Sequence, residues 1–299
     1  MAEAAFRCGF VTLLGRPNVG KSTLLNAMLG RKISITSRKP QTTRNRILGI
    51  KTGPDHQIIF VDTPGVHAAR RRQINALMNR TAEASLEGVD LILLVITALG
   101  WQAGDDRALA LARARRTPVM LVINMIDRLA RREDLLPLID DVRGKADFVE
   151  IVPVSARTGA QVPLLLERVV AHLPESPPGF PPDQLTDRSD RFMAAEFVRE
   201  QLFQQLGQEL PYVTAVVVER FERKPGLLSV GVVVLVEKPG QKAIVIGKGG
   251  ERLKRIGTAA RRSLEDYFGV KVFLEIWVKV REDWTDNPQA LRALGYWEP

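Results

Sequence analysis

Gly15-Arg16-Pro17-Asn18-Val19-Gly20-Lys21-Ser22-Thr23 is the stretch that decides the fold, because it follows the pattern G-x-x-x-x-G-K-S directly after the apolar run Phe10–Leu14. In this pattern the glycines let backbone N–H groups wrap phosphate oxygens, and the helix that follows adds its positive N-terminus. We expect Lys21 to neutralise the charge of β- and γ-phosphates and the Ser22 hydroxyl to ligate Mg²⁺. A glycine-rich turn between a strand and a helix would carry the same letters without binding phosphate, so the flanking sequence has to decide.

Three further polar motifs each follow an apolar run. Asp62-Thr63-Pro64-Gly65 follows Ile58–Val61, Asn124-Met125-Ile126-Asp127 follows Val119–Ile123, and Ser155-Ala156-Arg157 follows Ile151–Val154. With Phe10–Leu14 and Leu91–Ile96, these runs alternate with amphipathic stretches, which predicts buried parallel strands in an α/β sheet. Open α/β sheets bind ligands just past the carboxyl ends of their strands. The four motifs therefore predict a single nucleotide site.

Two carboxylates and one glycine have specific expected roles at this site. Asp62 is placed to order Mg²⁺ through a water molecule, and the Gly65 amide is placed to sense the γ-phosphate. Asp127 is expected to select the base, because guanine offers N1–H and N2–H₂ as adjacent donors, whereas adenine has an acceptor at N1. Taken alone, Asp127 also fits a helix N-cap before Arg128–Arg132. With the neighbouring motifs, the sequence predicts GTP rather than ATP.

Residues 6–175 resemble the translation-factor-related class of small GTPase domains, with five motifs in order. The resemblance implies that Thr42-Thr43-Arg44 is the first switch motif. It favours Thr43 as the Mg²⁺-ligating threonine, with Thr42 open as the alternative, and it implies Lys21, Thr43 and Gly65 as the catalytic residues. Met125 replaces the usual lysine of the guanine motif, and Val66 stands where Ras-like proteins carry the glutamine that orients water. Hydrolysis is therefore expected to be slow or to use another group.

Asn18 is the fourth residue of the phosphate loop. Its side-chain oxygen is placed to ligate a monovalent cation beside the bond between the β- and γ-phosphates, and related GTPases with this asparagine often respond to K⁺. The alternative is that Asn18 only stabilises the turn of the loop.

A change of pattern after the first domain predicts a second one. Five prolines between Leu173 and Leu185 block helix and ladder bonds. The prediction is a GTPase domain at 1–175, a proline-rich linker at 176–186 and a smaller α+β domain at 187–299. Its expected elements are a helix at Arg191–Leu206, strands at Tyr212–Val218 and Leu227–Val236, a helix at Glu251–Asp266 and a strand at Val270–Val280.

Gly247-Lys248-Gly249-Gly250 lies between the second of these strands and the basic helix. Glycines permit close approach to a nucleic-acid backbone, basic side chains meet phosphate, and apolar side chains contact single-stranded bases. A flexible turn is the alternative for an isolated Gly-x-x-Gly. In its context the motif resembles a KH domain with its strands ahead of the loop. The predicted RNA-binding residues are Ile244, Ile246, Gly247, Lys248, Gly249, Gly250, Arg252, Lys254 and Arg255.

The two domains together resemble the Era family of bacterial ribosome-assembly GTPases over nearly the whole chain. The resemblance implies binding to the 3′ end of 16S rRNA, help in rRNA processing and assembly of the 30S subunit, a monomer, and a cytoplasmic location with some peripheral attachment to the inner membrane. The rival hypothesis is a GTPase whose basic second domain docks on a membrane or a protein partner.

Composition agrees with a globular protein and excludes several other classes. The chain has 299 residues, 45% of them hydrophobic, and a net charge of +9. No apolar run approaches the about 20 residues that span a bilayer, and Met1–Phe6 shows no basic start of a secretory signal. The single cysteine, Cys8, excludes an internal disulfide and fits a reducing compartment.

Overall fold

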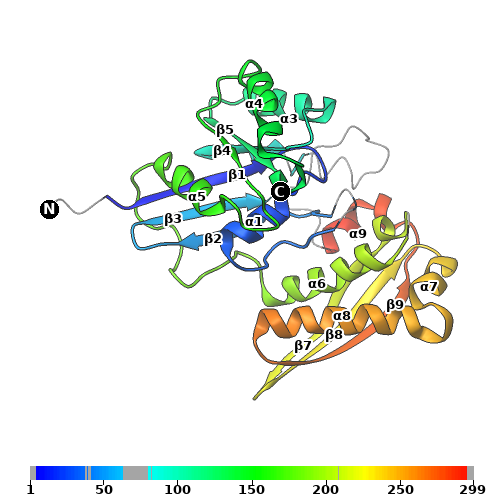
Figure 1. Ribbon diagram of the computed structural model, residues 1–299. Helices are drawn as coiled ribbons and strands as arrows, with labels where there is room; N and C mark the ends of the chain where they lie inside the picture. Colours follow the sequence, from blue (N-terminus) through cyan, green and yellow to red (C-terminus); the bar gives the residue numbers. More distant parts are fainter. Residues whose placement is uncertain are drawn as a thin grey trace. The chain divides into compact units, whose positions relative to one another are not determined.

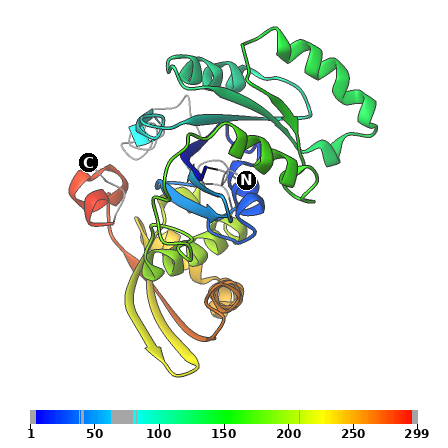
Figure 2. The same cartoon turned by 90° about the vertical axis from the view of Figure 1, so that its left-hand side faces the viewer.

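The structure is a computed structural model that describes residues 5–37, 39, 42–62, 80–81, 83–207 and 209–294. Contacts between residues divide the chain into two compact units (Figures 1 and 2). The first unit ends at Asp187. The second begins at Arg188 and also takes in the short early segment Ile35–Thr42.

The first unit is built on a six-stranded sheet in the order β2-β3-β1-β4-β5-β6. Its strands are β1 Arg7–Leu14, β2 Ile47–Thr52, β3 His56–Asp62, β4 Leu91–Thr97, β5 Val119–Asn124 and β6 Ile151–Pro153. All neighbouring strands are parallel except β2, which runs antiparallel to β3. The predicted mostly parallel α/β sheet is confirmed.

Helices cover the sheet on both faces, since every residue of β4 is buried. They are α1 Lys21–Leu29, α3 Ala103–Arg113, α4 Leu136–Arg143 and α5 Val162–Ala171. α3 and α4 contribute Ala108, Leu109 and Val142 to one core cluster, and α1 contacts β1, β2, β3 and α5. Because β1, β3, β4 and β5 are parallel, their carboxyl ends lie at one edge of the sheet, where the polar motifs begin.

The proline-rich segment is fastened to this sheet. The buried side chain of Gln57 in β3 accepts hydrogen bonds from the N–H groups of Gly179 (2.8 Å) and Phe180 (2.9 Å) and donates one to the Phe180 carbonyl (2.9 Å). Farther along, the Ile50 N–H donates to the Leu185 carbonyl (2.9 Å). The segment thus forms no strand of its own and is held by the Gln57 side chain of β3 and by a β-bridge between Thr186 and Gly49 of β2. The division at 175 and 186 remains a prediction.

The second unit is a smaller α+β structure, as predicted. Its elements are α6 Asp190–Gln205, β7 Ala215–Lys224, β8 Leu227–Val236, α7 Pro239–Ile246, α8 Glu251–Phe268, β9 Lys271–Val280 and α9 Pro288–Ala293. β8 is the central strand, antiparallel to β7 and parallel to β9. Alternate residues of β8, from Leu228 to Val236, are buried against Phe197 of α6 and Ile256 of α8, so one sheet face forms the core with the helices.

Among the elements that differ from the sequence prediction, three have a clear local cause. The strand expected at Tyr212–Val218 starts only at Ala215, because Leu210–Val213 forms a 3-10 turn around Pro211. β2 was not predicted, since Gly49 and Lys51 interrupt its short apolar run. α7 was not predicted either, because its last three residues, Ile-Val-Ile, favour a strand. Pro239 does not prevent this helix, because it lies in the first turn of α7, where proline is tolerated.

Among the described residues, no helix combines the length and the apolar character that a membrane span needs.

Candidate nucleotide and nucleic-acid sites

The phosphate loop joins β1 to α1 and fits tightly against the neighbouring strands. A Cβ on Gly15 would lie 2.4 Å from the Val95 carbonyl oxygen of β4. A Cβ on Gly20 would lie 2.4 Å from the Asn124 amide nitrogen at the end of β5. Gly20 also has a positive φ of 94°. Both glycines are therefore required for the loop to pass this close to the sheet.

Lys21, the first residue of α1, is held at the loop by backbone carbonyls. Its Nζ donates to the carbonyls of Gly15 (2.8 Å) and Arg16 (3.0 Å). Burial lowers the pKa of Lys21 to about 8, against the opposing effect of the Asp62 carboxylate. Phosphate oxygens at the loop would stabilise the charged form of this buried ammonium group.

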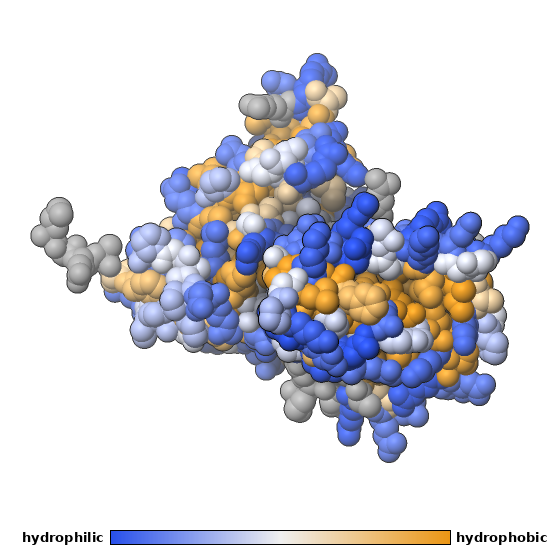
Figure 3. All heavy atoms as spheres, turned by 90° about the horizontal axis from the view of Figure 1, so that it is seen from below, coloured by the Kyte–Doolittle hydropathy of each residue, from blue (hydrophilic) through white to orange (hydrophobic). Residues whose placement is uncertain are grey.

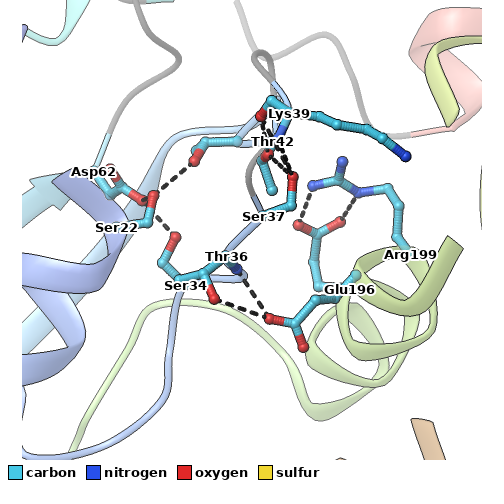
Figure 4. A network of polar contacts seen from close by, with 11 residues as sticks. Ser22, Ser34, Thr36, Ser37, Lys39, Thr42, Asp62, Glu196 and Arg199 are labelled. Carbon is cyan, nitrogen blue, oxygen red and sulfur yellow. Dashed lines mark hydrogen bonds and ion pairs between the residues drawn. The ribbon is translucent and has the colours of Figure 1, made fainter. Parts of the chain in front are cut away.

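Side-chain oxygens of Thr43 and Asp62 both lie within hydrogen-bonding distance of Ser22, the residue after Lys21; Figure 4 labels Ser22 and Asp62. The Ser22 Oγ lies 3.1 Å from Thr43 Oγ1 and donates to Asp62 Oδ2 at 3.2 Å. Hydroxyl and carboxylate oxygens are the ligands that Mg²⁺ prefers, so this set fits the metal that the sequence predicts. Thr42, the alternative ligand, instead bonds to Ser37 Oγ (2.8 Å) and to the Lys39 carbonyl (2.9 Å). The geometry thus places Thr43 beside Ser22.

Ser34 belongs to the same cluster, although no motif had singled it out. Its Oγ donates to Asp62 Oδ2 at 2.5 Å, and both residues are buried. Asn26 of α1 positions it, accepting from the Ser34 N–H (2.9 Å) and donating to the Ser34 carbonyl (2.7 Å). An asparagine in the middle of a buried amphipathic helix is the sequence signal that could have pointed to this loop.

Asp127 lies at the end of the next motif with both carboxylate oxygens engaged. Ser155 Oγ donates to Oδ1 at 2.6 Å, and Arg157 Nη2 lies 2.6 Å from Oδ2. The hydrogen bond from Ser155, aided by the Arg157 charge, lowers the pKa of Asp127 despite some desolvation. The Arg157 side chain is 75% exposed, so it gives way to a ligand at little cost. An ionised carboxylate is what two adjacent guanine donors need.

Asn124 ties the motifs to one another. Its side chain donates to the Val19 carbonyl of the phosphate loop (2.8 Å) and accepts from the N–H groups of Met125 (2.8 Å) and Ala156 (3.0 Å). Met125, with a positive φ of 68°, puts its methyl group near Gly20. Met125 therefore supplies packing where the usual motif has a cation.

The remaining predicted residues of the nucleotide site lie partly inside and partly outside the described residues. Asn18 is exposed and has a positive φ of 63°, a conformation that asparagine tolerates better than most residues. Pro17 and Thr23 lie in the loop and in the first turn of α1, and Ile126 begins a short 3-10 turn. Thr63, Pro64, Gly65 and Val66 lie outside the described residues, so their predicted roles stay predictions.

In the second unit, the segment Ile35–Thr42 packs on the end of α6. The Thr36 N–H donates to Glu200 Oε1 at 2.9 Å, and Lys39 Nζ donates to the carbonyls of Phe203 (2.6 Å) and Leu206. A lysine at the last carbonyls of a helix complements the negative end of its dipole. Figure 4 shows Thr36 and Lys39 beside this helix.

The Gly-x-x-Gly turn connects α7 and α8. Gly247, Gly249 and Gly250 have positive φ angles of 74°, 58° and 79°. A Cβ on Gly247 would lie 2.8 Å from Arg252 Cβ, whereas the other two glycines have open space around them. Lys248 and Gly249 are exposed. The turn therefore presents bare backbone and one ammonium group to solvent.

A groove opens beside this turn, between α8 and β9. Its cavity volume is about 340 Å³, and its lining residues are Gly250, Leu253, Lys254, Gly257, Thr258, Arg261, Leu274 and Ile276. Figure 3 shows hydrophobic side chains gathered over the second unit between hydrophilic margins. Both charged residues of the lining are basic, which suits an anionic chain whose bases have apolar faces.

The predicted RNA-binding residues are distributed unevenly around this groove. Gly250 and Lys254 line it, whereas Arg255 is exposed but does not. Ile244 is 50% exposed, and Ile246 packs partly against the core. Arg252 donates to the Ile244 carbonyl at 2.6 Å, which braces the end of α7. The sequence prediction missed Leu274 and Ile276, because they come from a strand distant in sequence.

Comparison with known proteins gives two family matches. The family described as 50S ribosome-binding GTPase matches residues 10–125. The KH domain family matches residues 209–285. The matches cover the phosphate loop and the Gly-x-x-Gly turn respectively.

Relatives and solved structures match over nearly the full length. The chain is 54% identical to GTPase Era of Coxiella burnetii (strain Dugway 5J108-111), covering 97% of this chain and 98% of the relative. It is also 54% identical to GTPase Era of Stenotrophomonas maltophilia (strain R551-3), covering 98% and 99%. A crystal structure of Era in complex with MgGDPNP and nucleotides 1506–1542 of 16S ribosomal RNA aligns with a TM-score of 0.93 and 41% identity, covering 97% of this chain and 99% of that one. An Aquifex aeolicus Era variant bound to GDP and AlF₄⁻ aligns with a TM-score of 0.94 and 40% identity, with the same coverage.

Proposed function

The chain belongs to the Era family of GTPases, and on that premise we propose that it is a GTP-hydrolysing switch protein that binds the 3′ end of 16S rRNA and assists rRNA processing and 30S subunit biogenesis. The observation that carries the RNA part is the groove between α8 and β9, with apolar and basic lining, that opens at the Gly-x-x-Gly turn. The related Era structure, which holds nucleotides of 16S rRNA, supports the choice of RNA.

Mg²⁺ is proposed as the cofactor of the nucleotide site. Ser22 and Thr43 would hold it directly and Asp62 through water, since their oxygens already lie together. When bound, the ion neutralises charge on the β- and γ-phosphate oxygens. Lys21 adds its own positive charge to these phosphates, and Asp127 orients the guanine base.

The rival hypothesis is tested by RNA sequence dependence. We expect this protein to bind an oligonucleotide with the 16S 3′-end sequence at least about tenfold more tightly than a scrambled one of equal length. Filter binding at fixed salt measures this, with sedimentation of anionic vesicles in parallel. Equal affinity for both oligonucleotides, together with strong vesicle binding, would favour docking on a membrane.

A cytoplasmic location with peripheral attachment to the inner membrane, and a monomeric state, complete the proposal. They follow from the family resemblance, and the net charge of +9 supports attraction to anionic surfaces.

K⁺ is proposed to stimulate hydrolysis through the Asn18 side-chain oxygen. Replacing Na⁺ by K⁺ at equal ionic strength should then raise the hydrolysis rate about tenfold, because a cation near the transferred phosphoryl group stabilises developing charge. Asn18→Gly should abolish the difference. Phosphate release in the two salts is the measurement.

Asn18→Gly separates the two hypotheses for this residue. Glycine adopts the positive φ of 63° without strain, so the turn is kept while the side-chain amide, with its oxygen, is lost. Equal wild-type rates in K⁺ and Na⁺, or a salt difference that survives in the glycine variant, would contradict the cation role.

A further inference from the structure

The Arg16 side chain turns from the phosphate loop into the protein. It is 16% exposed, and its Nε lies 3.2 Å from Asp105 Oδ2. Its Nη2 donates to Thr97 Oγ1 at the end of β4, at 3.1 Å. The second residue of the phosphate loop is thus attached to both a strand and the first turn of α3.

Arg16 is the cationic partner of the buried Asp105 carboxylate. The Asp105 side chain is fully buried, and its Oδ2 also accepts the Gln102 N–H at 2.9 Å, which closes the first turn of α3. Burial raises the pKa of Asp105, and the Arg16 charge opposes that rise. Removing one partner of a buried ion pair is strongly destabilising. Arg16 is therefore retained by Asp105 and is not free to reach a phosphate as an arginine finger.

Gly104 makes room for the aliphatic part of Arg16. A Cβ at this position would lie 3.1 Å from both Cβ and Cδ of Arg16. Glycine is a poor helix former compared with alanine. Its place in the first turn of α3 is explained by the Arg16 side chain that lies across it.

The backbone of Arg16 faces the opposite way, toward the nucleotide site. Its carbonyl accepts from Lys21 Nζ at 3.0 Å, next to the Gly15 carbonyl at 2.8 Å. We propose that Arg16 and Asp105 form a positioning pair that holds the phosphate loop in the shape that receives the nucleotide. The pair acts through the loop backbone and Lys21, and its role rests on the proposed GTPase function.

Calorimetric titration of the full chain with GDP and with a non-hydrolysable GTP analogue tests the pair. Arg16→Ala and Asp105→Asn should each weaken both nucleotides about tenfold, because a small displacement of a binding loop has effects of this order. The double variant should lose no more than either single one, since the two side chains act as a unit. Arg107→Ala, on the exposed face of α3, is the matched control and should bind as wild type does.

Gly104→Ala distinguishes positioning from stability. The added methyl group, 3.1 Å from Arg16 Cβ and Cδ, shifts that side chain by a few tenths of an ångström and removes no charge, and alanine favours the helix. Nucleotide affinity should fall about threefold to tenfold, while the thermal midpoint of the nucleotide-free protein should not fall. Single-turnover hydrolysis at saturating GTP should stay within about threefold of wild type in Gly104→Ala, because loss of uniform binding leaves the chemical step unchanged.

Several results would overturn the proposal. Folded variants that bind nucleotide as wild type does would reduce the pair to a stabilising contact. A hydrolysis rate that collapses at unchanged affinity would make Arg16 a catalytic group instead. A wild-type protein that binds no guanine nucleotide would remove the proposed GTPase function and the positioning role together.

Discussion

Asp127→Asn should weaken GDP binding about a hundredfold and strengthen XDP binding. The carboxylate is placed to accept from two adjacent guanine donors, and charged hydrogen bonds of this kind contribute about 1.5–3 kcal/mol each. An amide keeps one acceptor and brings a donor, which faces guanine N2–H₂ unfavourably and the C2 oxygen of xanthine favourably. Calorimetric titration with GDP, XDP and ADP measures the change.

The contacts of Asp127 within the protein are little disturbed by this substitution. In the wild-type chain Ser155 Oγ donates to Asp127 Oδ1 at 2.6 Å, and the amide oxygen of the variant can accept the same hydrogen bond. The exposed Arg157 loses only a screened ion pair. Asp134→Asn is a control, since it makes the same charge change at a surface carboxylate seven residues further on that is 40% exposed. A variant at Asp127 that prefers GDP over XDP as strongly as wild type would show that another group reads the base.

Gly249→Asp should abolish RNA binding, with a loss of at least about a hundredfold, and leave GDP affinity unchanged. A carboxylate on the exposed turn repels phosphate at the entrance to the groove, and like charges at an interface cost several kcal/mol. The side chain also keeps the RNA backbone away from the bare peptide. Filter binding to the 16S 3′-end oligonucleotide and calorimetry with GDP give the two affinities.

Gly226→Asp is a close control for this variant. Gly226 has a φ of 71° and open space around its Cβ position, as Gly249 has with 58°. It lies in the same unit, in the turn between β7 and β8, so backbone strain and charge change are matched. The structure leaves room for both side chains, and both variants should fold. RNA affinity that is equal in the two variants would remove the turn from the binding site.

The sequence predicted the parts of the fold that local pattern controls. β4 and β8 were placed to within one residue at each end. β4 begins with an uninterrupted apolar run of six residues, and β8 is long and Val-rich enough to be recognised despite Ser229 and Gly231. α7 was missed because its β-branched end favours a strand, and only the tertiary core that buries Val245 overrides that preference. Local pattern carries no information about such packing.

The residues of the candidate sites likewise fall into those that a local motif reveals and those that only the tertiary structure brings in. Asp127 and Lys21 are recognisable because their motifs are contiguous and follow strands. Ser34 and Arg16 depend on contacts across long stretches of chain, to Asp62 and to Asp105. Leu274 and Ile276 reach the groove only because β9 pairs beside β8. A single sequence does not reveal which distant residues the topology brings together.

The grouping of Ile35–Thr42 with the second unit bears on how modular this protein is. Cutting the chain at the proline-rich segment would leave Ile35–Thr42 on the N-terminal piece, apart from the rest of the second unit. The end of α6 would then lose the Thr36 and Lys39 donors that bond to it. A transplant of the RNA-binding half into another protein would need to bring those eight residues along, inserted out of order. Modules that look separable in the linear sequence are, in this molecule, interleaved.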